Sequence, residues 1–122
     1  MTILDETTAA AEGAAWTAVC PLDRLVPDRG VAALVAGRQV AVFRLSSGAL
    51  AAVDNVDPCT GVAVLSRGLV GDVDGTPTIA SPLYKQRFDL VTGRCLDVDG
   101  VTVAVHDVTV ADGVVLVRPA AA

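Results

Sequence analysis

The sequence predicts an all-β domain, an antiparallel sandwich or small barrel of short strands. Valine-rich runs recur along the chain, and turn residues such as glycine, aspartate and serine separate them every few residues. Valine favours extended backbone because its branched side chain packs well on a pleated sheet, and no stretch has the periodicity of a long helix. With 122 residues, 52% of them hydrophobic, the chain is long enough to bury a single core.

The N-terminal part is expected to form three strands after a leader. Residues 1–13 are small and acidic without periodicity, which predicts a disordered leader, and residues 14–118 are expected to form one domain. The first strand is expected at Trp16–Val19, and residues 20–25, which contain a proline, then favour a short helical turn. Strands at Val31–Val35 and Gln39–Leu45 follow, joined by a tight turn.

Alternation in the third of these strands assigns its side chains to two faces. Successive side chains of a strand point in opposite directions, so Val40 and Val42 share one face, and Ala41, Phe43 and Leu45 share the other. The Ser-Ser-Gly sequence that follows predicts a turn, after which the chain is expected to return as another strand of the same meander.

The rest of the chain continues the meander around an insertion. Further strands are expected at Ala49–Val53, Gly68–Val73, Pro77–Ala80, Phe88–Leu90, Arg94–Leu96, Val101–Val105, Val108–Val110 and Val114–Val117. Asp-Gly pairs between several of them are strong hairpin signals. Residues 54–90 interrupt the meander with two proline-containing loops, which we expect to form an inserted subdomain, and residues 119–122 are expected to be a frayed tail.

Charge and cysteine usage exclude several classes of partner. The net charge of −5 disfavours nucleic acid and anionic membrane surfaces, because both require a basic face. The N-terminus has no basic start followed by an apolar core, and no apolar stretch is long enough to cross a bilayer. The three cysteines are odd in number and far apart, which predicts reduced thiols and a cytoplasmic protein.

Two loops within the insertion have an unusual sequence. The first reads Asp57-Pro58-Cys59-Thr60-Gly61, and the second reads Ser81-Pro82-Leu83-Tyr84-Lys85-Gln86-Arg87-Phe88-Asp89, followed by a Thr-Gly turn. Their order and spacing resemble the Rieske fold, in which C-P-H and C-P-x-H loops supply two thiolates and two imidazoles to a [2Fe-2S] cluster. Within that fold, S-P-L-Y-K-Q with S-R-G-x-V-G-D upstream is similar to the small subunit of assimilatory NAD(P)H-dependent nitrite reductase.

The four ligand positions of the resemblance carry Asp57, Cys59, Ser81 and Tyr84. Iron–sulfur and zinc sites select thiolate and imidazole ligands, whereas this set offers one thiol beside a carboxylate, a hydroxyl and a phenol. We therefore expect no metal and no cofactor in this chain. Ser81 and Tyr84 are expected to fill the vacated space and to form hydrogen bonds across the two loops.

The resemblance implies a non-catalytic accessory subunit of an enzyme that reduces nitrite to ammonium with electrons from NADH or NADPH. FAD, sirohaem and an iron–sulfur cluster are then expected in the large subunit, which is the expected partner. The basic residues of the loop tip are the candidate docking surface: Arg67, Lys85, Gln86 and Arg87. Alternatively, Asp72, Asp74 and Asp89 pair with these cations and neutralise them.

Two other functions remain as alternatives. One is a Rieske-type ferredoxin with atypical ligands, and the other is a stand-alone binding module that holds a small anion near Lys85 and Arg87. A hydrolytic site is not expected, because His106, the only histidine, cannot easily bond to its neighbour Asp107 on a strand and is interpreted as a surface residue. Cys59 is expected to be an inert, partly buried thiol, and the other cysteines to be packing residues.

Overall fold

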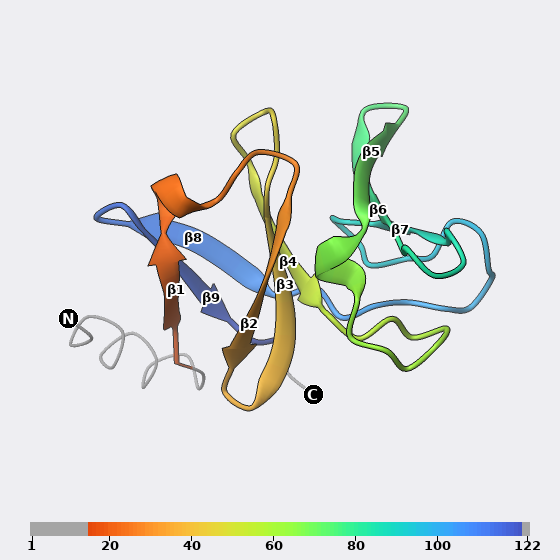
Figure 1. Ribbon diagram of the computed structural model, residues 1–122, viewed down its shortest axis with the longest axis horizontal. Helices are drawn as coiled ribbons and strands as arrows, with labels where there is room; N and C mark the ends of the chain where they lie inside the picture. The colour runs from red at the N-terminus through yellow and green to blue at the C-terminus, as the bar shows by residue number, and fades with distance from the viewer. Residues whose placement is uncertain (1–14, 121–122) are drawn as a thin grey trace.

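This computed structural model describes residues 15–120. The strands of this part of the chain form three antiparallel sheets of three strands each (Figure 1). The predicted leader lies outside the described residues. The strands are β1 (Thr17–Pro21), β2 (Gly30–Val35), β3 (Arg38–Arg44), β4 (Leu50–Asp54), β5 (Leu69–Val73), β6 (Thr76–Ala80), β7 (Arg87–Asp89), β8 (Asp107–Ala111) and β9 (Val114–Arg118). Their order is β1-β9-β8, β2-β3-β4 and β5-β6-β7. The all-β antiparallel fold predicted from the sequence is confirmed.

The sheet β2-β3-β4 lies between the other two, and its central strand β3 is buried on both faces (Figure 1). Val40 and Val42 belong to a core shared with Val115 and Val117 of β9. The opposite face of β3 contributes to a second core, which contains Ala41, Phe43, Leu45, Leu65, Ile79 and Phe88. The predicted division of this strand into two faces is therefore confirmed, and each face meets a different neighbouring sheet.

Two short 3-10 turns connect these layers. The first, η1 (Leu22–Arg24), is the helical turn predicted after the first strand. The second, η2 (Leu65–Arg67), leads from the first loop into β5. Asn55 holds η2 in place, because its backbone oxygen accepts from the amides of Val64 and Leu65 and its side-chain oxygen accepts from Ser66 N at 2.7 Å. Within residues 15–120, no helix is long and apolar enough to span a membrane.

The strands predicted at 94–96 and 101–105 are not formed. This segment makes only isolated bridges: Arg94 with Thr102, Cys95 with Phe88, and Val105 with Val53. Its backbone groups bond alternately to different neighbours: Val103 N donates to Gly93 O, while Ala104 O accepts from Asp54 N. Because no single strand faces it along its length, the segment covers the outer edge of β4 and a turn without becoming a strand itself.

Candidate functional site

The four positions that carry metal ligands in a Rieske protein form two pairs of opposite character. Asp57 and Ser81 are fully buried, whereas Cys59 and Tyr84 are exposed. The Ser81 hydroxyl donates to Asp57 Oδ2 at 2.6 Å, and the Cys59 amide donates to Asp57 Oδ1 at 2.8 Å. The buried pair therefore bonds the two loops directly to each other.

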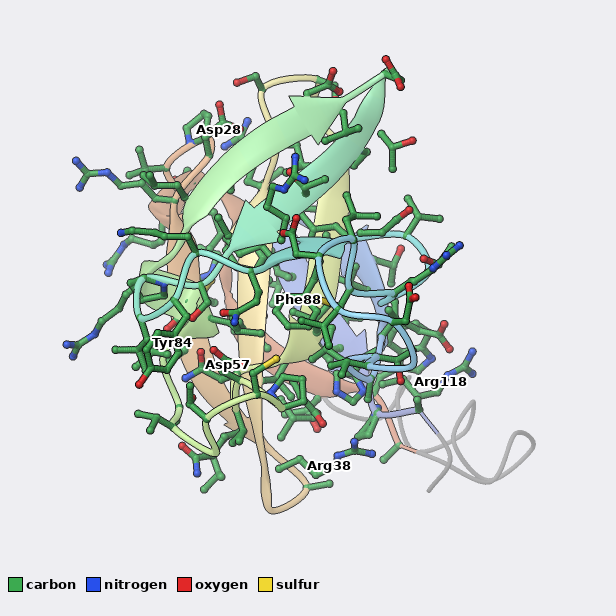
Figure 2. All side chains as sticks on the ribbon, turned by 90° about the vertical axis from the view of Figure 1, so that its right-hand side faces the viewer. Asp28, Arg38, Asp57, Tyr84, Phe88 and Arg118 are labelled. Atoms are coloured by element: carbon green, nitrogen blue, oxygen red, sulfur yellow. The ribbon has the colours of Figure 1, made fainter. Side chains whose placement is uncertain are left out.

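The sequence suggests that Tyr84 fills the vacated space, but in the structure it does not. It is 70% exposed and lies with Asp57 at the end of the molecule that faces the viewer in Figure 2. The Ser81 hydrogen bond across the loops is present, but the phenol has no part in it. A shallow hollow separates the tips of the two loops, and its lining mixes polar and apolar groups: Cys59, Thr60, Val62, Leu83 and Tyr84.

Cys59 is exposed, which corrects the expectation that it is partly buried. Partial desolvation, together with the negative charge of Asp57 beside it, raises the pKa of the Cys59 thiol. A thiol with a raised pKa is a weak nucleophile and a weak metal ligand at neutral pH, because the thiolate is the reactive form. The inert character predicted for this cysteine is supported by its surroundings.

The donors of this site do not fit a [2Fe-2S] cluster. At the two thiolate positions stand a carboxylate and a hydroxyl that are already bonded to each other, and the remaining soft donor is a single thiol. Among residues 15–120, no group of three or more His, Cys, Asp or Glu side chains is placed to hold a metal ion.

Arg87, one of the four predicted docking residues, is paired within the chain. Its guanidinium bonds to both carboxylate oxygens of Asp97, at 2.8 and 3.1 Å, and its amide also donates to Asp97. These bonds lower the pKa of Asp97 to about 2. Asp72 and Asp89, which the sequence suggested as partners of the cations, accept hydrogen bonds from backbone amides of their own turns.

The other three predicted docking residues differ in their availability. Arg67 is exposed, and its guanidinium has no hydrogen-bond or ion-pair partner among the described residues. Lys85 is exposed and has a positive φ of 67°, and its ammonium makes one long contact with Pro82 O at 3.4 Å. Gln86 is half-buried, and its Oε1 is buried without a hydrogen-bond partner in residues 15–120. Arg67 and Lys85 are thus the two cations of the predicted set that remain available.

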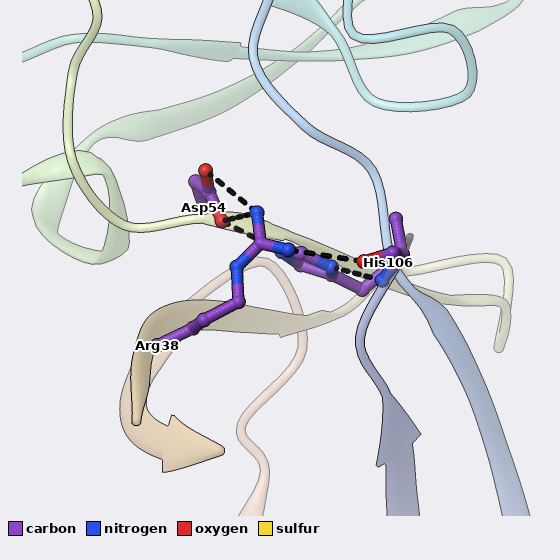
Figure 3. A network of polar contacts seen from close by, with 4 residues as sticks. Arg38, Asp54 and His106 are labelled. Atoms are coloured by element: carbon purple, nitrogen blue, oxygen red, sulfur yellow. Dashed lines mark hydrogen bonds and ion pairs between the residues drawn. The ribbon is translucent and has the colours of Figure 1, made fainter. Parts of the chain in front are cut away.

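His106 is buried, which corrects its interpretation as a surface histidine. Its Nδ1 accepts from the amide of Ala120 at 2.9 Å, so the ring hydrogen is on Nε2, which lies 2.7 Å from Asp54 Oδ1 (Figure 3). Arg38 bonds to the same carboxylate and to Ala120 O. Asp54 is 52 positions from His106, and no local sequence pattern could have identified this network.

The fold and the two loops have clear relatives among known proteins. The Rieske-like [2Fe-2S] domain family matches residues 15–118. The nitrite reductase (NADH) small subunit of Salmonella typhimurium is 43% identical over 104 residues, which cover 84% of this chain and 96% of that protein. A crystal structure from Mycobacterium tuberculosis, provisionally assigned as an NADH-dependent nitrite reductase small subunit, has a TM-score of 0.85 at 46% identity and covers 89% of this chain and 98% of its own.

A third relative is a much longer protein. The nitrite reductase [NAD(P)H] large subunit of Klebsiella oxytoca is 45% identical over 82 residues, which cover 67% of this chain but only 8% of that protein. In that organism a segment similar to this chain is therefore part of the large polypeptide itself.

Proposed function

The chain belongs to the Rieske-like [2Fe-2S] domain family and, within it, to the small subunits of NADH-dependent nitrite reductase, and we propose from this that it is a cofactor-free accessory subunit. The enzyme reduces nitrite to ammonium with electrons from NADH or NADPH in nitrite assimilation. FAD, sirohaem and an iron–sulfur cluster are placed by this proposal in the large subunit, to which the present chain binds. Its three free cysteines are consistent with a cytoplasmic location.

The hydrogen bond between Asp57 and Ser81 carries the proposal that this chain holds no electron carrier. It occupies the two positions at which the thiolates of a Rieske protein stand, and it joins them to each other at 2.6 Å. The hydroxyl donor of Ser81 compensates the buried Asp57 carboxylate, which supports the proposal that this hydrogen bond joins the loops in place of a cluster. The subunit therefore acts through its surface.

The relative in Klebsiella oxytoca supports the large subunit as the partner. Where a similar segment and the rest of that protein are one polypeptide, the two are held at high effective concentration. A separate small subunit must obtain the same association through its own contacts. Such contacts are expected to require an exposed surface with aromatic and arginine side chains, which are the residues that contribute most to binding at protein interfaces.

The tip of the two loops supplies the aromatic part of such a surface. Tyr84 is 70% exposed, and Val62 and Leu83 beside it are 45% and 44% exposed. They line one hollow, so a single apolar side chain of the partner could contact all three. Lys85 lies next to the tyrosine in the chain and adds a positive charge at the rim. We assign this tip as the centre of the docking surface, with the Gln86 backbone oxygen closing the second loop by accepting from Ser81 N and Arg87 paired to Asp97 at its end.

Co-expression with a large subunit tests the assignment. The wild-type chain is expected to co-elute with the large subunit, and the isolated chain to be colourless and free of iron and acid-labile sulfide. Tyr84→Ala should weaken binding by roughly tenfold or more, as truncation of an interface aromatic does. Leu34→Ala, at a residue of β2 that is 72% exposed, is the matched control and should bind like wild type.

Two outcomes would contradict the proposal. Stoichiometric iron and sulfide in the purified chain would establish the ferredoxin alternative. Failure of the wild-type chain to bind any large subunit at micromolar concentration would favour a stand-alone binding module on the same scaffold.

A further inference from the structure

Two glycines bring three separate segments of the chain into direct contact beside the loop tip. A Cβ atom at Gly30 would lie closer than 3.0 Å to the backbone of Ser66, and one at Gly68 would lie equally close to the carbonyl oxygen of Ala80. Gly68 has a φ of −77°, so its backbone does not require glycine for its conformation. Both glycines are therefore explained by the close approach of two backbones.

These contacts place two arginines at one surface hollow, and Lys85 belongs to the loop that begins beside it. Arg29 precedes Gly30 and Arg67 precedes Gly68, so each lies at one of the two backbone contacts. The Lys85 amide donates to Ser81 O at 3.0 Å, next to the residue that Gly68 touches. We name Arg29, Arg67 and Lys85 the basic ridge. In Figure 2, several nitrogen-tipped side chains project from the same edge of the molecule, between the labels of Asp28 and Tyr84.

The charges of the basic ridge are not neutralised by the described part of the chain. Arg29 and Arg67 line one surface hollow, yet neither guanidinium has a hydrogen-bond or ion-pair partner in residues 15–120. Asp28 lines the same hollow, but its carboxylate accepts from the amide and the hydroxyl of Ser46 and makes no ion pair with either arginine. Several other arginines of the fold are paired with a carboxylate, for example Arg87 with Asp97.

We propose that the basic ridge is the receptor for a carboxylate-bearing segment of the large subunit. The inference rests on the proposed function and adds the chemistry of the partner and a residue, Arg29, that lies outside the loops. An arginine fork binds a carboxylate through two parallel hydrogen bonds, and two arginines at one hollow can hold two such groups. A chain of net charge −5 repels an acidic partner elsewhere, so the ridge also sets the orientation of docking.

An apolar residue beside the arginines makes the hollow suitable for a peptide segment. Leu69 lines the same hollow and is 73% exposed, so a partner with an apolar side chain next to its acidic ones would bury it. A free inorganic anion has no apolar group that could pack against Leu69. The observations therefore favour a polypeptide over a small anion.

Charge reversal on the ridge provides the test. Arg29→Glu combined with Arg67→Glu should weaken binding to the co-expressed, cofactor-loaded large subunit by ~10-fold or more and should reduce the dependence of affinity on salt. Arg24→Glu combined with Arg94→Glu is the matched control with the same change in net charge, because both arginines are also exposed and have no side-chain partner within the described residues. The pair Arg29→Lys and Arg67→Lys keeps the charge but not the fork and should bind with intermediate affinity.

The two proposals fail in different ways. If the wild-type chain does not bind the large subunit, the proposed function is lost. If the wild-type chain binds and the doubly reversed variant, shown to be folded by its circular dichroism, binds equally well, only the basic ridge is rejected. Saturable binding of inorganic phosphate that is abolished in the doubly reversed variant, with binding of the large subunit unchanged, would also overturn the ridge as a protein receptor.

Discussion

Asp57 and Ser81 are the pair of residues on which the interpretation of the site depends. The Asp57 carboxylate is completely buried and accepts one hydrogen bond from the Ser81 hydroxyl and another from the Cys59 amide. A buried carboxylate needs such donors, because leaving it unpaired carries the full cost of its desolvation. The pair therefore does structurally what a metal cluster does in a ligand-bearing Rieske loop: it joins the two loops.

Removing the Ser81 hydroxyl should destabilise the whole domain. Ser81→Ala leaves Asp57 with one donor fewer inside the protein, and we expect a loss of about 1–3 kcal/mol in the free energy of unfolding, measured with urea. Ser47→Ala is the control, because the Ser47 hydroxyl accepts only an exposed, 3.3 Å hydrogen bond from Ala49 N. A loss for Ser81→Ala no larger than that of Ser47→Ala would show that the pair contributes nothing.

The ion pair between Arg87 and Asp97 predicts a pH dependence. A carboxyl whose pKa falls on folding, here from 3.8 to about 2, stabilises the folded state above pH 3.8 and loses this contribution as the pH falls towards 2. Both side chains are partly exposed, 46% and 35%, so the effect is small. Asp97→Asn should have a lower urea midpoint than wild type at neutral pH, and the difference should vanish near pH 2, whereas Asp99→Asn should show no such trend.

At the scale of elements, the contacts made by two glycines decide where the loops lie. Gly30 at the start of β2 touches η2, and Gly68 just after η2 touches the end of β6. The first contact joins the central sheet to η2, and the second joins the end of η2 to the sheet β5-β6-β7. The loop tip and the basic ridge are thus positioned by close packing of backbones, which a side chain at either glycine would prevent.

Alanine at either glycine should therefore be costly. The added methyl group would overlap a backbone carbonyl oxygen that cannot move away easily, so Gly30→Ala and Gly68→Ala should each lower the free energy of unfolding by roughly 1–3 kcal/mol. Gly71→Ala in β5 is the control, because its methyl group would meet only the Thr78 hydroxyl, at 3.2 Å. Thermal or urea unfolding of the three variants measures this, and equal stability of all three would contradict the packing argument.

At the scale of the whole molecule, the three sheets are joined by two cores and one polar network. The cores lie on the two faces of β3. The network joins β3 and β4, through Arg38 and Asp54, to the chain beyond β9 at Ala120 (Figure 3). The tail that the sequence suggested would fray is held at this residue by two hydrogen bonds, while residues 121–122 lie outside the described part of the chain.

Replacing His106 should loosen the connection between the sheets. His106→Leu leaves the Ala120 amide without its acceptor and leaves the Asp54 carboxylate with Arg38 as its side-chain donor in a partly buried site, for an expected loss of about 1–3 kcal/mol. Hydrogen exchange of the Ala120 amide should become faster at the same time. Asp107→Asn, which removes only the exposed ion pair with Arg118, should have little effect on either measurement.

The sequence by itself determined the features that depend on local patterns. The alternation in residues 39–45 predicted both faces of β3, and the turn residues predicted most hairpins, because strand period and turn geometry are properties of a few consecutive residues. The two loops could be recognised for the same reason, since each is a short contiguous motif. The missing strand at 101–105 shows the limit: a valine-rich run becomes a strand only when a partner faces it along its length.

Only the tertiary structure decided which distant side chains meet. In the folded protein Asp54 forms a hydrogen bond with His106, Arg87 forms an ion pair with Asp97, and Tyr84 lies at the surface. The tertiary structure also brings Arg29 beside Arg67, which no spacing in the sequence suggests. Such pairings join residues tens of positions apart, and the energy that selects them comes from the packing of whole sheets, so they follow from the assembled fold and not from any local pattern.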